Sequence, residues 1–323
     1  MRILLTGASG FVGRTLQARW LAGGMCGLLG AQRQLPAQPF TGVESCRAPS
    51  LGPEAEWLQA LPGVDVIIHC AARVHVMREQ SSDPLTEFRR TNVEGTLRLA
   101  HQAAVAGVKR FIFLSSVKVN GECNNLGSPY LADAQPAPTD PYGISKMEAE
   151  QGLRALAIET GMQVVIIRPV LVYGPGVKAN FLSMMRWLYK GLPLPFGAIH
   201  NRRSLVALDN LVDLIVTCIV HPAAANQTFL VSDGEDLSTT ELLRRMGVAL
   251  GKPVHLLPVP SRLLEVGAAM LGKQALAQRL CGSLQVDICK TYELLGWSPP
   301  VGVDEALRRT AVHFLSTQNG SDV

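Results

Sequence analysis

The chain has 323 residues, which at roughly 150 residues per domain predicts two domains, or one α/β domain with a substantial extra lobe. Hydrophobic residues make up 47% and charged residues 17%, so a sizeable core can form and global disorder is excluded. The formal net charge of +4 argues against binding to nucleic acid through bulk charge, and it leaves room for a local basic pocket.

Cysteine usage and hydropathy indicate the compartment. The seven cysteines are an odd number without a C-x-x-C pair, so we expect neither a disulfide framework nor a metal site, and a cytoplasmic location. The first residues are typical of a strand rather than of a signal peptide. The longest uncharged apolar stretches, such as residues 20–31, are shorter than the roughly 18 residues of a membrane span, so we expect no stable membrane insertion.

Strands and helices alternate along the first 170 or so residues. Such alternation predicts right-handed crossovers and a parallel sheet. Proline at residue 141 and glycine at residue 161 mark the start and the end of one helix. The predicted strands span residues 2–5, 28–32, 64–70, 110–115 and 163–168, and the predicted helices span residues 14–21, 84–107 and 141–161.

The character of the sequence changes after Pro169, where glycine, proline and basic residues become frequent. A strand and a helix are predicted at 205–220, a late sheet strand at 227–231 and further helices at 235–314. An apolar stripe at helical spacing over residues 263–280 is expected to pack in the core, with contact to a partner or a membrane surface as the alternative. We therefore predict a Rossmann-type doubly wound sheet with a smaller, mostly helical C-terminal substrate lobe. The expected division is residues 1–173 with a return at 205–232 for the first domain, 174–204 and 233–316 for the lobe, and a frayed tail at 317–323.

A glycine-rich turn follows the first strand directly and precedes a helix. Gly7 allows a sharp turn, Gly10 allows close approach of a pyrophosphate, and Gly13 allows the helix to pack close to the strand. The free N–H groups at the start of the helix favour phosphate binding. With Phe11 and Val12, these glycines form a candidate dinucleotide site.

The end of the second strand bears on the choice of cofactor. An acidic residue there would bind the adenosine ribose hydroxyls of NAD, whereas an arginine accommodates the 2′-phosphate of NADP. Residues 30–34 contain no acid and do contain Arg33. The sequence therefore favours NADP(H), with NAD(H) as the alternative.

A tyrosine and a lysine four residues apart, Tyr142 and Lys146, lie on one face of the helix predicted at 141–161. A lysine ammonium beside a phenol favours the phenolate and lowers the pKa of the tyrosine, so Tyr142 can exchange a proton with a sugar hydroxyl or ketone. Ser116 follows the strand at 110–115, at the sheet edge where open α/β sheets bind ligands. We predict that Ser116, Tyr142 and Lys146 are the catalytic residues.

As an ordered set, the motifs up to about residue 215 resemble the extended short-chain dehydrogenase/reductases, specifically their nucleotide-sugar epimerase/dehydratase branch. Residues 115–121 further resemble a bacterial subgroup near UDP-glucose 4-epimerases that includes 4-keto-sugar reductases of surface-polysaccharide synthesis. The resemblance implies a homodimer formed through the helices at 84–107 and 141–160. The matching segments are residues 6–13, 65–72, 92–96, 115–116, 142–146, 168–169, 172–176 and 205–213.

The resemblance also implies that Tyr142 and Lys146 contact the cofactor, with Lys146 anchoring the nicotinamide ribose, and it implies roles for residues outside the catalytic set. Ala71 and Ala72 would line the cofactor through their backbone, and Asn92 would brace the active-site strands beside the cofactor. Asn180 and Arg203 lie where relatives bind the nucleotide diphosphate, with Arg202 as a rival to Arg203.

Two positions are less easily assigned. Lys118, two residues beyond Ser116, could neutralise a diphosphate, polarise the sugar carbonyl or be a solvated loop lysine. Many 4-epimerases carry an asparagine where this chain has Leu171, which weakens the case for epimerisation.

Two reactions at C4 of a nucleotide sugar use the same three catalytic residues. We expect first the NADPH-dependent reduction of a UDP-4-keto-6-deoxy-hexosamine. The alternative is 4-epimerisation of a UDP-hexose or UDP-N-acetylhexosamine with bound NAD. A catalytically silent dinucleotide-sensing protein on the same fold is a more distant alternative, and the presence of both Tyr142 and Lys146 argues against it.

Overall fold

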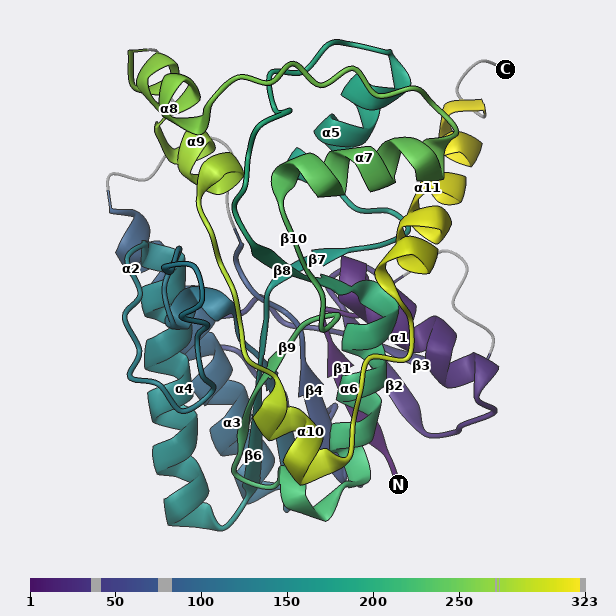
Figure 1. The fold of residues 1–323 in the computed structure, drawn as a ribbon. Coiled ribbons are helices and arrows are strands. Elements are labelled where there is room, and N and C mark those ends of the chain that lie inside the picture. Colours follow the sequence, from purple (N-terminus) through teal and green to yellow (C-terminus); the bar gives the residue numbers. More distant parts are fainter. Residues whose placement is uncertain (36–41, 75–82, 271, 273, 320–323) are drawn as a thin grey trace.

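The central element of the fold is a seven-stranded sheet (Figure 1), in a computed structural model that describes residues 1–35, 42–74, 83–270, 272 and 274–319. All its neighbouring strands are parallel, in the order β3-β2-β1-β4-β5-β6-β9. This order is the doubly wound arrangement that the sequence predicts. The strands are β1 (Ile3–Thr6), β2 (Leu28–Gln32), β3 (Glu44–Arg47), β4 (Val66–His69), β5 (Arg110–Leu114), β6 (Gln163–Pro169) and β9 (Thr228–Val231).

Helices cover both faces of the sheet (Figure 1). They are α1 (Phe11–Ala22) and α6 (Leu208–Val220) on one face, and α3 (Gly95–Val105) and α4 (Pro141–Thr160) on the other. Successive residues of β1 alternate between the two layers, because strand side chains point to opposite faces. Ile3 and Leu5 pack with α1 and α6, whereas Leu4 packs with α3 and α4.

The segment expected as one helix at 84–107 has three parts. A short helix, α2 (Pro84–Phe88), runs into a π-helical stretch, η1 (Arg89–Glu94), and then into α3. Asp83 caps α2, and its carboxylate accepts a hydrogen bond from the Thr86 N–H at 3.2 Å. The π-helical stretch widens the helix locally, a feature often found at functional sites.

The C-terminal part is mostly helical and contains a second, three-stranded sheet, in the order β10-β8-β7. Its strands are β7 (Leu171–Tyr173), β8 (Arg203–Ala207) and β10 (Asp236–Leu237). Helix α11 extends to Asn319, so part of the tail expected to fray is helical; residues 320–323 lie outside the described residues. The helices are α5 (Ala179–Tyr189), α7 (Thr239–Leu250), α8 (Ser261–Met270), α9 (Gln274–Cys281), α10 (Cys289–Leu295) and α11 (Val303–Asn319), with short turns η2 (Val117–Val119) and η3 (Pro222–Ala224).

The apolar stripe at 263–280 does not behave as one core segment. Helix α8 buries none of its residues, and Leu263, Val266 and Met270 are exposed. Helix α9 does reach the interior, where Ala277 is buried. The prediction of core packing is therefore wrong for α8, which projects from the molecule beside α9 (Figure 1).

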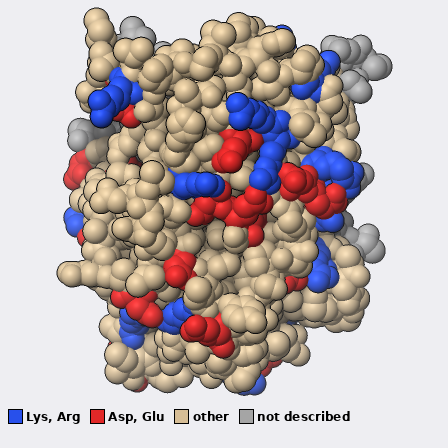
Figure 2. All heavy atoms as spheres, in the orientation of Figure 1, with Lys and Arg blue, Asp and Glu red and all other residues tan. Residues whose placement is uncertain are grey.

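Charged side chains of both signs gather on one face over α7, β10 and α11 (Figure 2). They form ion pairs: Arg245 contacts Glu235 and Asp304, and Arg309 contacts Asp209 and Glu305. This face therefore presents largely neutralised charge rather than a field of one sign. Within the described ranges, no helix is both long and apolar enough to cross a bilayer.

Candidate active site

The glycine turn between β1 and α1 has no room for larger residues. Gly7 adopts a positive φ of +70°, and a Cβ there would lie 2.7 Å from the Ala71 nitrogen. A Cβ on Gly13 would lie 2.2 Å from the Gly7 carbonyl oxygen. Glycine at both positions therefore lets the first turn of α1 sit directly against the loop and the end of β4.

A pocket of about 700 Å³ opens beside this turn and is called here the glycine-loop pocket. Gly10 caps α1 without a side-chain hydrogen bond, so the first N–H groups of the helix have no side-chain acceptor there. With its close-packed glycines, the site fits the pyrophosphate of a dinucleotide. The lining includes Thr6, Gly7, Gly10, Ala31, Gln32, Arg33, Trp57, Ala71, Ala72 and Arg73, and it contains no acidic residue among those that the structure describes.

The remaining predicted cofactor residues lie next to this pocket rather than in its wall. Val12 packs against the core cluster of α1 and α6. Phe11 lines a second pocket, described below. Asn92 is buried: it accepts a hydrogen bond from the Arg73 N–H at 2.8 Å, donates to the Arg73 carbonyl at 3.0 Å and donates to Ser145 at 3.1 Å. Asn92 thus links the loop after β4 to α4, rather than one strand to another.

His69 lies at the end of β4. Its ring lies between two hydroxyls, with Nδ1 2.7 Å from Thr6 Oγ1 and Nε2 3.0 Å from Thr96 Oγ1. The side chain is fully buried. Burial, together with the charge of Lys146, lowers the pKa of His69 to about 3. A neutral His69 therefore links the residue before Gly7 to α3.

Tyr142 and Lys146 lie on one face of α4, as predicted. Asp140 caps this helix by accepting a hydrogen bond from the Gly143 N–H at 2.7 Å. The Lys146 ammonium lies 5.9 Å from the centre of the Tyr142 ring and donates to the Leu114 carbonyl at 2.8 Å. Lys146 thereby ties the start of α4 to the end of β5.

The pKa values of this pair differ from the sequence-based expectation. Burial raises the pKa of Tyr142, and the negative charge of Asp140 acts in the same direction. Burial lowers the pKa of Lys146 to about 8. The predicted lowering of the tyrosine pKa is therefore wrong for this structure, because loss of solvation outweighs the distant ammonium. Tyr142 is a neutral phenol near pH 7, which suits it to donate a proton.

A second pocket, of about 460 Å³, is called here the Tyr142 pocket. Its wall brings together six predicted site residues from separate parts of the chain, namely Phe11, Ser116, Lys118, Tyr142, Asn180 and Arg203. Leu171, which replaces the asparagine of many 4-epimerases, also lines it. The two pockets meet at the glycine turn, where Gly10 faces one and Phe11 the other. The rest of the lining includes Val117, Glu122, Pro169, Val170, Val172, Val177, Lys178, Phe181, Gln278, Arg279 and Leu284.

Lys118 lines the Tyr142 pocket, but its charge is already matched. Its ammonium contacts Glu122 at 2.8 Å and also contacts Asp140, the cap of α4. The backbone N–H of Lys118 donates to Ser116 Oγ at 3.2 Å. Of the three roles considered for Lys118, the structure thus disfavours the solvated loop lysine.

One end of the Tyr142 pocket is basic. Arg203 donates to the Gly282 carbonyl at 3.0 Å, and both burial and the charge of Arg279 lower its pKa. Arg279 lies in the last turn of α9, and sequence reasoning missed it. Lys178 lies in the same wall. Arg202, the rival to Arg203, instead contacts the Asp236 carbonyl at 3.1 Å and is not in the pocket wall.

The sequence of this chain is similar to those of known proteins. The model of the NAD dependent epimerase/dehydratase family matches residues 3–232. A UDP-glucose 4-epimerase of Vibrio cholerae is 55% identical over 260 residues, which cover 80% of this chain and 79% of the relative. A GDP-6-deoxy-D-mannose reductase of Pseudomonas aeruginosa is 26% identical over 317 residues, which cover 95% of each chain.

A solved structure shows the same fold. A solved structure of UDP-glucose 4-epimerase from Thermotoga maritima, with UDP-glucose, matches with a TM-score of 0.78 at 23% identity, covering 98% of this chain and 100% of that chain. The family model spans most of the sheet and both faces of helices described above. The motif set, the sheet order and these matches agree, so the chain belongs to the NAD dependent epimerase/dehydratase family of extended short-chain dehydrogenase/reductases.

Proposed function

We propose that the chain reduces the C4 ketone of a UDP-4-keto-6-deoxy-hexosamine with NADPH. The observation that carries this proposal is that two pockets adjoin at the glycine turn. Tyr142 and Ser116 line one of them, which has a basic end, and the other is the glycine-loop pocket. The most specific part of the proposal is the sugar, a hexosamine with a 6-deoxy group. This sugar agrees with the apolar residues in the wall of the Tyr142 pocket, among them Val117, Pro169 and Leu171.

Each catalytic side chain has a separate task in this reaction. A bound nicotinamide dinucleotide supplies the hydride. Tyr142 donates its proton to the C4 oxygen, and its raised pKa keeps that proton in place near neutral pH. Ser116 donates a hydrogen bond to the same oxygen and so orients it. The Lys146 ammonium, 5.9 Å from the centre of the Tyr142 ring, provides a positive charge that favours the phenolate left after proton transfer.

The preference for NADPH is supported by Arg33. This exposed side chain lies in the wall of the glycine-loop pocket, where an acid would bind the ribose hydroxyls of NAD, and the described wall contains no acid. For the substrate, we propose that Arg203, Arg279 and Asn180 bind the diphosphate, since a guanidinium matches phosphate oxygens in charge and geometry.

A second candidate function is 4-epimerisation of a UDP-hexose or UDP-N-acetylhexosamine with retained NAD. The Vibrio cholerae relative, named a UDP-glucose 4-epimerase, is 55% identical and favours this reading. The same three residues serve it, with Tyr142 first accepting and then returning a proton. Leu171 and Arg33 weigh against it.

A product assay separates the two reactions. The purified chain is given UDP-GlcNAc, UDP-GalNAc or the UDP-4-keto-6-deoxy derivative, each with NADPH or NADH, and the products are identified by mass spectrometry and NMR. We expect stoichiometric oxidation of NADPH with the keto sugar and no conversion of the other two. Retained NAD(H), with interconversion of UDP-GlcNAc and UDP-GalNAc and no net NADPH consumption, would overturn the reductase proposal in favour of the epimerase.

We further propose that the chain works as a homodimer in the cytoplasm. Val105 at the end of α3 and Ile158 near the end of α4 are exposed by 86% and 88%, as apolar side chains at an interface between copies would be. All seven cysteines are free, which suits a reducing compartment. Light scattering on the purified chain tests the dimer, and a monomeric mass would contradict it.

A further inference from the structure

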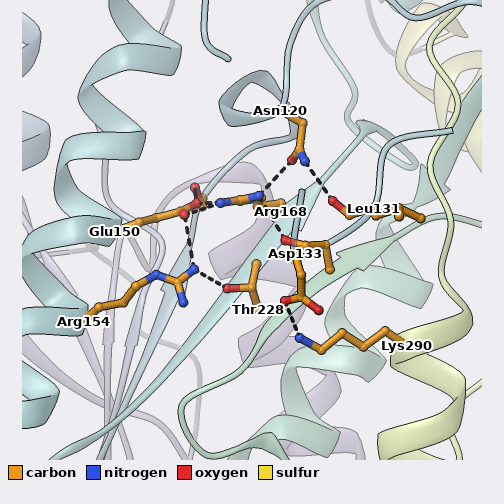
Figure 3. Close-up of polar contacts among 10 residues, drawn as sticks. Asn120, Leu131, Asp133, Glu150, Arg154, Arg168, Thr228 and Lys290 are labelled. Carbon is orange, nitrogen blue, oxygen red and sulfur yellow. Dashed lines mark hydrogen bonds and ion pairs between the residues drawn. The ribbon is translucent and has the colours of Figure 1, made fainter. Parts of the chain in front are cut away.

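A buried ion pair lies behind the Tyr142 pocket, between α4 and β6. Glu150 and Arg168 are only 3% and 2% exposed. Arg168 Nε donates to Glu150 Oε1 at 2.9 Å, and Arg168 Nη2 donates to Glu150 Oε2 at 2.6 Å (Figure 3). The guanidinium therefore forms a bidentate contact with the carboxylate. A bidentate contact of this kind fixes the orientation of both side chains. No role for it follows from the reaction described above.

Glu150 also reaches the strand that leads to the catalytic serine. Ser115 Oγ donates to Glu150 Oε1 at 2.6 Å. One turn earlier on α4, Lys146 donates to the carbonyl of Leu114 at 2.8 Å. Side chains at consecutive turns of α4 therefore bind consecutive residues at the end of β5, directly before Ser116.

Arg168 holds the chain on the other side of Ser116. Its Nη1 donates to Asn120 Oδ1 at 3.1 Å, and Asn120 in turn donates to the Leu131 carbonyl at 3.0 Å (Figure 3). Asn120 directly follows η2, and the η2 residue Lys118 lines the Tyr142 pocket. The ion pair thus fixes the segments immediately before and after the serine.

The same carboxylate is electrostatically linked to Lys146. Four titratable groups face the ammonium: Tyr142 and Glu150 on α4, and His69 and Cys70 at the end of β4. Cys70 and then Glu150 oppose the lowering of the Lys146 pKa by burial. The Cys70 thiol has its own pKa raised to about 12 by burial, and that of His69 is lowered to about 3, so both are neutral near pH 8. Glu150 is therefore the charged neighbour that favours the ammonium.

We propose that Glu150, oriented by Arg168, is a positioning residue that sets the place of Ser116 relative to Tyr142 and Lys146 and keeps Lys146 charged. This inference rests on the proposed function, because it assigns the three side chains to one reaction. Glu150 itself touches neither pocket that would hold the sugar or the dinucleotide.

The first test removes the contact to β5 and leaves the ion pair in place. Ser115→Ala is expected to lower kcat about tenfold with KM within about twofold, because misplacement of a catalytic group slows the chemical step more than binding. Ser115→Thr keeps the hydroxyl and is expected to restore most of kcat. Wild-type kcat in Ser115→Ala would contradict the positioning of Ser116.

The second test removes the charge and keeps the shape. In Glu150→Gln we expect a kcat loss of about tenfold or more, and we expect the fall in kcat at alkaline pH, set by Lys146 near pH 8 in the wild type, to move to lower pH. Glu148→Gln is the matched control: Glu148 lies on the same helix and pairs with Arg89 at 2.6 Å, away from β5. It is expected to keep both kcat and the pH profile of the wild type.

Three outcomes overturn the inference or separate it from the proposed function. If the Glu150→Gln variant folds and has the same kcat and the same fall in kcat at alkaline pH as the wild type, the inference is overturned. If Glu150→Gln does not fold, the Ser115→Ala and Ser115→Thr pair decides. If the wild type turns over no UDP-sugar, the proposed function fails alone, and NMR titration of the Lys146 side chain becomes the readout. A lower Lys146 pKa in Glu150→Gln then upholds the coupling, and an identical pKa overturns it.

Discussion

The two pockets of this chain are assembled in opposite ways. Among the described residues, the lining of the glycine-loop pocket lies between Thr6 and Thr91, and much of it follows the ends of neighbouring parallel strands. The Tyr142 pocket draws its wall from α1, η2, α4, β7, α5, β8 and α9, between Phe11 and Leu284. The first is therefore specified by segments within residues 6–91, and the second by packing of segments far apart in the sequence. Substrate choice can change through the second pocket while the first stays intact.

Tyr142 lines the Tyr142 pocket and not the glycine-loop pocket, so its loss tests whether the two pockets act independently. We expect Tyr142→Phe to lower kcat by about 100-fold or more, because general acid catalysis is removed. The dissociation constant of NADPH, measured by fluorescence titration, should stay within about twofold. Unchanged turnover would remove Tyr142 from the mechanism, and lost cofactor binding would show that the pockets are not independent.

Arg279 tests the basic end of the Tyr142 pocket. Arg279→Gln is expected to raise KM for the UDP-sugar by up to about 100-fold, the scale of a lost charge-assisted hydrogen bond, with the affinity for NADPH unchanged. Arg202→Gln is the control, because Arg202 lies outside the pocket wall. Equal effects of the two variants on KM would contradict the assignment of the diphosphate to Arg279.

The pH dependence of stability tests the contribution of His69, which is buried beside the glycine-loop pocket. The ring is neutral in the folded chain, with a pKa of about 3, and gains a proton below about pH 6.5 on unfolding. Stability is therefore lost as pH falls from 6.5 toward 3. From this side chain alone we expect the free energy of unfolding to be about 2 kcal/mol lower at pH 5 than at pH 7. Urea unfolding at both pH values checks this, and His69→Asn should show a shallower pH dependence; equal slopes would contradict it.

Arg33 is expected to give the smallest effect. Arg33→Gln should reduce the preference for NADPH over NADH, measured as the ratio of kcat/KM values, by about tenfold, because one charged contact to the 2′-phosphate is lost. Arg19→Gln, at an exposed position on α1 outside both pockets, should leave the ratio unchanged. If Arg33→Gln leaves the ratio of kcat/KM values unchanged, Arg33 does not set the preference for NADPH, and other residues of the glycine-loop pocket must do so.

The contrast also explains what could be predicted from the sequence. Six strands of the large sheet follow apolar runs and were predicted, whereas β3 was missed because Glu44–Arg47 is a polar edge strand with partly exposed side chains. Strands β7 and β10 are too short to form a pattern. The order of the motifs was sufficient to predict the fold class.

Within the site, the same division holds. Gly7, Ala71 and Tyr142 could be placed because each belongs to a local motif. Arg279 could not, because it lies in an apolar stripe more than 160 residues after Ser116 and only packing brings it to the pocket. The pairing of Lys118 with Asp140, 22 residues away, is likewise a product of tertiary structure.

The position of β9 in the sheet has a consequence for synthesis. Strand β9 pairs with β6, yet Pro169 and Thr228 are separated by the whole of β7, α5, β8 and α6. At about 5–20 residues per second, a ribosome takes roughly 3 to 12 seconds to make the intervening chain. During that interval β6 presents an open hydrogen-bonding edge on a nascent chain, the kind of edge that invites pairing with a wrong partner. The second neighbour of β6 in the sheet therefore becomes available only after the intervening elements have been synthesised.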